Sequence, residues 1–74
     1  MELSKKLLFK HKKTNKNGST EIYYIYRIQY DNKINIRFGY YNIIDNNYYD
    51  NIICEVSESS VKTLIPILQN EKII

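Results

Sequence analysis

The sequence is poor in several residue types on which particular folds and chemistries depend. Its 74 residues include one cysteine, one histidine, one proline, two glycines and no tryptophan. The lone Cys54 cannot form an intrachain disulfide, which excludes a disulfide-stapled secreted fold. With His11 as the only histidine, one chain cannot supply the usual ligands of a zinc site. Two glycines are also too few for a glycine-rich phosphate-binding loop.

Long apolar runs are absent as well. No segment approaches the roughly 18 apolar residues that are needed to cross a membrane. The apolar run at residues 7–9 is far too short for a secretory signal. We therefore expect a cytoplasmic protein with no membrane partner. Asp45 and Asp50 could form a carboxylate pair, but they lie in a polar segment with nothing to desolvate them. We expect no enzyme activity and no cofactor.

The residues that are present come mainly from four types. Ile, Lys, Asn and Tyr supply 39 of the 74 residues, whereas the chain has only two Arg and no Ala. These four types share A/T-rich codons, which indicates an AT-rich genome such as that of a low-GC bacterium, its phage or another mobile element. A chain of this length forms a single domain, residues 1–74, and buries only roughly 60% of the surface of its unfolded form. We therefore expect association, most simply as a homodimer.

Alternating side chains predict an antiparallel sheet. In residues 21–30, apolar and aromatic side chains recur at every second position, which is typical of a half-buried strand. Residues 34–41 repeat the pattern, so residues 21–41 should form a hairpin. The Asn, Gly and Ser content of residues 14–20 indicates a loop. Further strands are expected at about residues 5–13 and 51–56, with a turn or long loop over residues 42–51.

The register of the hairpin follows from which side chains must share a face. Cross-strand partners lie on the same face of a sheet. A two-residue loop would set Ile28 against Asn35 and mix core with solvent. A three-residue loop pairs Ile28 with Ile36 and Tyr26 with Phe38, and loops of this length are common in hairpins. The sequence therefore predicts the three-residue loop.

A helix is predicted over residues 58–70. Ser57 has the residue type of a helix N-cap, and Glu58 follows in the first turn, where the helix dipole favours an acid. Pro66 should kink the helix or split it, because proline lacks the amide hydrogen that an interior helix position donates. The predicted fold class is α+β: a small antiparallel β-β-β-β sheet followed by one C-terminal helix packed on one face. The apolar positions that would face the sheet are Val61, Leu64, Ile65 and Leu68.

The predicted register also creates a candidate binding surface on the uncovered face. It places Arg27 opposite Arg37, and Tyr23 opposite Tyr41. Arginine grips phosphate and tyrosine stacks on bases, so this face would bind single-stranded nucleic acid. The N-terminal lysines Lys10, Lys12 and Lys13 would add electrostatic reach.

The same residues can also have purely structural roles. Each arginine can instead lay its stem over apolar neighbours and meet water or Glu21. The lysines can instead protect an edge strand from aggregation.

Three segments are similar to a known family. Ile34-Asn35-Ile36-Arg37 resembles a family strand of the form Ile-Asp-Ile-Arg, and Cys54-Glu55-Val56-Ser57 resembles a short strand that ends in a helix cap. The apolar positions after residue 60 match those of the helix that follows. The family is that of the single-stranded-DNA-binding transcriptional coactivators of the positive-cofactor-four type. The resemblance implies a dimer that holds single-stranded DNA on curved, basic β surfaces.

A second hypothesis belongs to a different class of function. Short AT-rich reading frames without catalytic residues are often small effectors of phages or mobile elements. Such a protein could inhibit a host defence enzyme by protein–protein contact, as anti-CRISPR proteins do. An open sheet edge would add to the interface by β-augmentation. The other candidate interface residues are Tyr40, Tyr48 and Tyr49, with Ile73 and Ile74 as residues buried between two copies of the chain.

Overall fold

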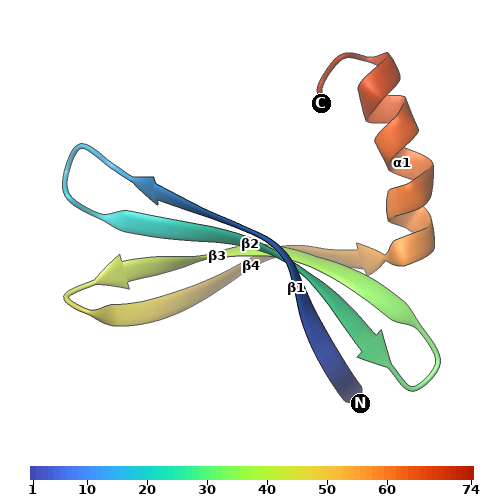
Figure 1. Cartoon of the computed structure of the whole chain (residues 1–74), viewed down its shortest axis with the longest axis horizontal. Coiled ribbons are helices and arrows are strands. Elements are labelled where there is room, and N and C mark those ends of the chain that lie inside the picture. Colours follow the sequence, from blue (N-terminus) through green and yellow to red (C-terminus); the bar gives the residue numbers. More distant parts are fainter.

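Four antiparallel strands lie side by side in sequence order, and a single helix follows them (Figure 1). The structure is a computed structural model that describes residues 1–74. The predicted α+β class, an antiparallel sheet followed by one C-terminal helix, is confirmed. The elements are β1 (Glu2–Thr14), β2 (Thr20–Tyr30), β3 (Ile34–Ile44), β4 (Asn47–Ser57) and α1 (Glu58–Asn70).

The strands are longer than the sequence predicts, and of the turn or long loop predicted over residues 42–51 the structure contains a turn. β3 continues to Ile44 and β4 begins at Asn47, so only Asp45 and Asn46 join them. Both joining residues have positive φ, 51° for Asp45 and 66° for Asn46. Two positive φ angles are typical of a type I′ hairpin turn, and Asp and Asn tolerate this conformation. The Asn-rich segment is therefore a tight turn followed by a strand.

The register predicted for the β2–β3 hairpin is wrong. The amide of Tyr30 donates to the carbonyl of Lys33 at 2.8 Å, which closes a two-residue turn rather than a three-residue loop. Ile28 therefore lies opposite Asn35, and Tyr26 lies opposite Arg37. A hydrophobic pattern specifies register strongly only where one face alone is buried. Here both faces carry aromatic and aliphatic side chains, so the pattern did not decide between the two registers.

One side of the sheet carries a row of tyrosines. Tyr24 and Tyr26 lie two residues apart on β2, and Tyr41 lies two residues from Gly39, the β3 partner of Tyr24. Tyr48 lies on β4, two residues from Asp50, the partner of Tyr41. Positions two residues apart on a strand share a face. We call this side the tyrosine face, after Tyr24, Tyr26, Tyr41 and Tyr48.

The other side is apolar at its centre. Ile25 lies opposite Phe9 of β1 on one flank and opposite Phe38 of β3 on the other. Ile53 of β4 lines the same shallow hollow, whose volume is about 210 Å³. The register of β4 shifts next to it, between the positions that face Phe38 and Gly39. We call this side the apolar face, after Phe9, Ile25, Phe38 and Ile53.

The helix forms where it is predicted but does not cover the sheet. Ser57 is its N-cap, and the Ser57 hydroxyl accepts from the Ser60 amide at 3.2 Å. The helix stands off the end of β4 (Figure 1), and none of its residues is buried. The helix contacts β3 and β4, but its apolar stripe is only partly covered, and Leu64 remains 49% exposed.

Of the two effects predicted for Pro66, a kink or a split, the split does not occur. The helix continues through Pro66 to Asn70. Proline leaves the carbonyl four residues earlier, that of Lys62, without its usual helical donor. Both Pro66 and Lys62 are exposed, so water can take that place. An exposed position thus tolerates a proline that a buried helix would not.

Very little of the chain is buried. Only 5 of the 74 residues are buried, and the hydrophobic ones are Tyr24, Ile28 and Ile36. Every residue of β1 is exposed. The overall extents of 38 × 35 × 15 Å describe a thin slab in which neither face of the sheet has a second layer over its centre. The functional question is what each of these two faces contacts.

Candidate nucleic-acid interface

The structure separates the residues that the predicted register had brought together. Arg27 lies opposite Ile36, on the same side of the sheet as Tyr23 and the apolar face. Arg37 lies opposite Tyr26, on the same side as Tyr41 and the tyrosine face. The prediction that the two arginines lie opposite each other is therefore wrong, as is the pairing of Tyr23 with Tyr41. A slip of one residue moves every side chain of one strand to the other face.

Arg27 is held by the start of the helix. Its Nε donates to Glu58 Oε2 at 2.7 Å, and Lys62 lies 3.7 Å from the other oxygen of the same carboxylate. The hydrogen bond from Arg27 lowers the pKa of Glu58 below its usual range. Glu58, which the sequence places in the first helical turn, thus ties α1 to β2. Arg27 is engaged by a carboxylate of its own chain.

Arg37 belongs to a polar network centred on Glu55. Its Nε donates to Glu55 Oε1 at 2.6 Å, while the hydroxyl of Tyr30 and the amide of Asn35 both donate to Oε2, at 2.5 and 3.0 Å. Glu2 adds a second carboxylate 3.4 Å from the Arg37 guanidinium. The hydrogen bond from Tyr30, together with those from Asn35 and Arg37, lowers the pKa of Glu55 to about 2. Arg37 is therefore a structural residue that balances a partly buried acid.

The tyrosines of the tyrosine face contact one another across three strands. The ring of Tyr24 lies 5.0 Å from that of Tyr26 and 5.1 Å from that of Tyr41. Tyr48 continues the row, 6.3 Å from Tyr41 in an edge-on arrangement. Such centroid distances are favourable for aromatic pairs. The exposed fraction of the side chains increases along the row. Tyr24 is only 3% exposed, whereas Tyr48 is 64% exposed.

Tyr24 anchors this row. Its hydroxyl donates to the Asp50 carboxylate at 2.5 Å, which ties β2 to β4 across β3. Burial, and then this hydrogen bond, raise the pKa of the Tyr24 phenol well above its usual value. The ring crosses β3 at Gly39, where an added Cβ would collide with the Tyr24 ring and would lie 2.7 Å from the Asn51 carbonyl oxygen. Glycine in a strand often marks such a close approach.

The lysines of β1 divide between the two faces. Lys10 and Lys12 pair with Tyr24 and Ile22, which places them beside the tyrosine row, and Lys13 pairs with Glu21 on the opposite side. Lys5 also lies on the tyrosine side, with its ammonium group 4.5 Å from the centre of the Tyr26 ring. None of the lysines of β1 forms an ion pair with a carboxylate. Their charges are therefore available to an anionic partner.

The remaining candidate residues lie apart from one another. Tyr40 packs against Tyr23 on the apolar side, with 5.3 Å between ring centroids. Tyr49 is adjacent to Tyr48 but lies on the opposite face, paired with Asn42. Ile73 and Ile74 follow the helix and are exposed. The structure thus does not gather these residues into a single surface.

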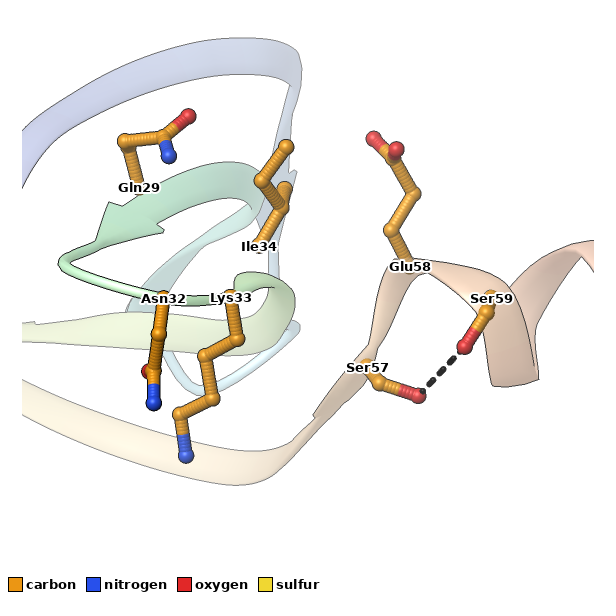
Figure 2. Close-up of a pocket in the computed structure, with 7 residues that line it drawn as sticks. All are labelled: Gln29, Asn32, Lys33, Ile34, Ser57, Glu58 and Ser59. Carbon is orange, nitrogen blue, oxygen red and sulfur yellow. Dashed lines mark hydrogen bonds between the residues drawn. The ribbon is translucent and has the colours of Figure 1, made fainter.

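A polar hollow of about 390 Å³ lies between the β2–β3 turn and the start of α1 (Figure 2). Lys33 and Asn32 point to one side of it and Glu58 to the other, so their charged and polar ends do not converge (Figure 2). The hydroxyl of Ser57 is already used as a helix cap. No buried polar side-chain atom in the chain lacks a hydrogen-bond partner. The hollow therefore shows no constellation for binding a ligand.

Sequence reasoning missed part of the candidate surface. Tyr24, Tyr26 and Lys5 are not among the site residues that the sequence predicts. Gly39 was the available signal, because a glycine inside a strong strand pattern indicates the close approach of another group. A glycine at position 39 is consistent with a large side chain, here the Tyr24 ring, that lies across β3 on this side of the sheet.

A scan against protein-family models and searches of curated proteins and solved structures found no match to this chain. The resemblance to the single-stranded-DNA-binding coactivators therefore stays a prediction. No helix of the structure has the length and apolar character that would let it cross a membrane. No group of three or more His, Cys, Asp or Glu residues is arranged to hold a metal ion.

Proposed function

We propose that this protein is a non-enzymatic module that binds single-stranded nucleic acid across the tyrosine face and along β1. The observation that carries the proposal is the placement of Lys5, Lys10 and Lys12 beside the tyrosine row, without any carboxylate partner. Cations next to exposed aromatic rings are the combination that binds single strands with little sequence preference. The proposal includes a cytoplasmic location, where an exposed free thiol such as that of Cys54 stays reduced.

The two residue types have different parts in the proposed complex. The lysines neutralise phosphates and release counterions, which provides affinity that depends on salt. Exposed tyrosine rings stack on bases, which requires bases that are not already stacked in a duplex. The 13 residues of β1 have a contour length of roughly 40 Å, which is long enough for a site of several nucleotides.

The two arginines have a structural part in this proposal. Arg27 and Arg37 are bound to Glu58 and Glu55 at 2.7 and 2.6 Å, and a phosphate would have to displace those carboxylates. The proposal therefore moves the phosphate contacts from the arginines to the lysines of β1. The basic and aromatic character of the predicted surface is kept, with different residues.

A fluorescence-anisotropy titration with single- and double-stranded oligonucleotides tests the proposal. We expect the single strand to bind more tightly. If three lysines contact phosphate, the affinity for a single strand should fall about 20-fold between about 50 and about 200 mM salt. The absence of binding at the lower salt concentration would contradict the proposal.

Two adjacent tyrosines provide a matched test of the stacking surface. Tyr48 lies on the tyrosine face and Tyr49 on the opposite face, and both are well exposed, at 64% and 52%. Tyr48→Ala should weaken binding about 10-fold, because stacking on one base contributes about 1 to 3 kcal/mol. Tyr49→Ala should leave the affinity within about 2-fold, since a surface substitution outside the site has little effect. Equal losses for both variants would argue against a binding surface on one face.

The exposed end of β4 favours a second candidate function, that of a small effector which inhibits a host enzyme. β4 is an edge strand, and its Tyr48 and Tyr49 protrude on either side of that edge. An exposed edge can accept a strand of a partner protein, and tyrosine provides rigid contact area. This function predicts a stable stoichiometric complex with a defence nuclease and no affinity for free oligonucleotides.

A further inference from the structure

The chain exposes more surface than a compact protein of its mass. The usual scaling of surface with mass gives about 4,800 Å² for a folded chain of 8.9 kDa, whereas this chain exposes 5744 Å². The surplus of roughly 900 Å² is close to the ~800 Å² that each partner contributes to an interface of standard size. A single chain therefore leaves uncovered about as much surface as one interface would bury.

Part of this uncovered surface is the apolar face. Phe9 and Ile53 are 54% and 60% exposed, although both line the hollow at the centre of that face. None of the residues that line the hollow carries a charge. An apolar surface of a second copy can therefore cover the hollow without burying a charged side chain of its lining. Contiguous apolar patches of this kind mark interaction sites.

The helix carries a second uncovered apolar surface. Leu64 and Ile67 are about half exposed, and Val61, Ile65 and Leu68 are only partly covered. In Figure 1 the helix leaves the end of β4 and its C-terminus lies away from the strands. Within its own chain the helix lies against β3 and β4, and Glu58 at its start reaches Arg27 of β2. Its apolar stripe and the apolar face of the sheet are thus two complementary surfaces that one chain does not bring together.

We propose that two copies of this chain form a two-fold dimer in which the helix of each copy covers the apolar face of the other. A two-fold arrangement uses both surfaces twice, because every contact made by one copy is repeated by its partner. The dimer would bury the surplus surface and supply the second layer that the sheet lacks. The tyrosine face lies on the opposite side of the sheet and stays open in this dimer.

The mass in solution and the thermal stability test the dimer directly. Sedimentation equilibrium should give twice the chain mass of 8.9 kDa. The melting temperature of the unmodified chain should rise over about a hundredfold increase in concentration, because only the folded state associates. A single-chain mass at the highest concentration would overturn the proposal and leave the apolar face to a different partner protein. Growth into open-ended polymers would overturn it as well, since a two-fold contact closes on itself.

Neighbouring isoleucines provide matched variants. Ile53 lines the apolar hollow, whereas Ile52 pairs with Gly39 on the tyrosine side, and the two are similarly exposed, at 60% and 54%. Ile53→Glu should raise the dimer dissociation constant at least about 10-fold, since a desolvated charge would meet the partner's helix. Ile52→Glu should change it by less than about 2-fold. A larger effect from Ile52→Glu than from Ile53→Glu would refute the assignment of faces.

The helix side of the contact needs its own variant. Leu64→Glu introduces a charge on the exposed part of the stripe, where it removes no buried contact within one chain. It should weaken the dimer about as much as Ile53→Glu, while circular dichroism should show an unchanged helix content. A dimer that tolerates Leu64→Glu but not Ile53→Glu would contradict packing of the helix on the partner's sheet.

Discussion

The two faces of the sheet differ in how far contacts within the chain hold their side chains. On the tyrosine face, Tyr24 and Glu55 are held by hydrogen bonds that join β2, β3 and β4 within one chain. On the apolar face, Phe9 and Ile53 are half exposed and have no layer of their own chain above them. The comparison teaches that hydrogen bonds within one chain order the tyrosine face, whereas the apolar face leaves large apolar side chains exposed.

The largest effect on stability should come from Gly39→Ala. The added Cβ would collide with the Tyr24 ring and approach the Asn51 carbonyl, and the hydrogen bond to Asp50 holds that ring in place. We expect the free energy of unfolding to fall by about 3 kcal/mol, because overpacking at a site bounded by backbone cannot relax easily. Urea unfolding would measure this loss.

Gly18→Ala is the matched control. Gly18 has a φ of 87° in the β1–β2 loop, with open space where a Cβ would be added. This substitution should therefore show only backbone strain, of about 1 kcal/mol. If the two glycine variants were equally destabilised, the close packing of Tyr24 over β3 would not be a main source of stability.

Glu55→Gln should have the next largest effect. The substitution removes the charge that Arg37, Tyr30 and Asn35 share, and hydrogen bonds to charged groups contribute about 2 kcal/mol. Thermal unfolding at neutral pH would measure the change. Equal stability of the variant and the unmodified chain would show that the network does not order the tyrosine face.

The same network predicts a dependence of stability on pH. The folded-state pKa of Glu55, about 2, lies below its reference value of 4.5, so the folded chain binds fewer protons than the unfolded chain between these values. The stabilisation from Glu55 is therefore present above about pH 4.5 and is lost as the pH falls toward about 2. In Glu55→Gln, the loss of stability over this range of pH should be smaller.

Tyr24→Phe should have a moderate effect. It removes the hydrogen bond to Asp50, whose carboxylate is exposed and can bind water instead, so the loss should be about 1 kcal/mol. Burial and the Asp50 carboxylate raise the pKa of Tyr24 above its reference value of 10.0, so its stabilisation should be lost as the pH rises above that value. The variant should lack this alkaline component when unfolding is followed as a function of pH.

The smallest effect should come from the apolar face of the single chain. Phe9→Ser removes a side chain that is 54% exposed, so the unfolding free energy should change by less than about 0.5 kcal/mol at dilutions where the chain is monomeric. The difference should grow with concentration if the proposed dimer buries that side chain. An effect as large as that of Gly39→Ala in dilute solution would remove the distinction between the two faces.

The sequence was sufficient to predict the elements but not their register. Ser57 and the apolar spacing after it located the helix, and alternation located the strands of the hairpin. A two-residue and a three-residue turn between β2 and β3 can be told apart only if it is known whether one face of the sheet or both faces are partly covered. Ile28 pairs with Asn35 because the polar network around Glu55 satisfies the Asn35 amide, which a hydrophobic pattern does not reveal.

The candidate site depended on this register. Alternation alone cannot tell which residues of β3 lie beside those of β2, so the predicted register brings Arg27 and Arg37 together although a slip of one residue separates them. The carboxylates that bind them, Glu58 and Glu55, lie 31 and 18 residues away in the sequence. Contacts over such distances follow from the completed fold and not from a local pattern.

A comparison of lysine pairs on β1 tests most directly the claim that the two faces have different roles. Lys10 and Lys12 lie on the tyrosine side, whereas Lys6 and Lys13 pair with Arg27 and Glu21 on the other side. Changing either pair to Gln removes the same charge from the same strand. The affinity for a single-stranded oligonucleotide at low salt should fall about 10-fold for Lys10→Gln with Lys12→Gln, and less than about 3-fold for Lys6→Gln with Lys13→Gln. Equal losses for the two pairs would contradict a binding surface on the tyrosine face.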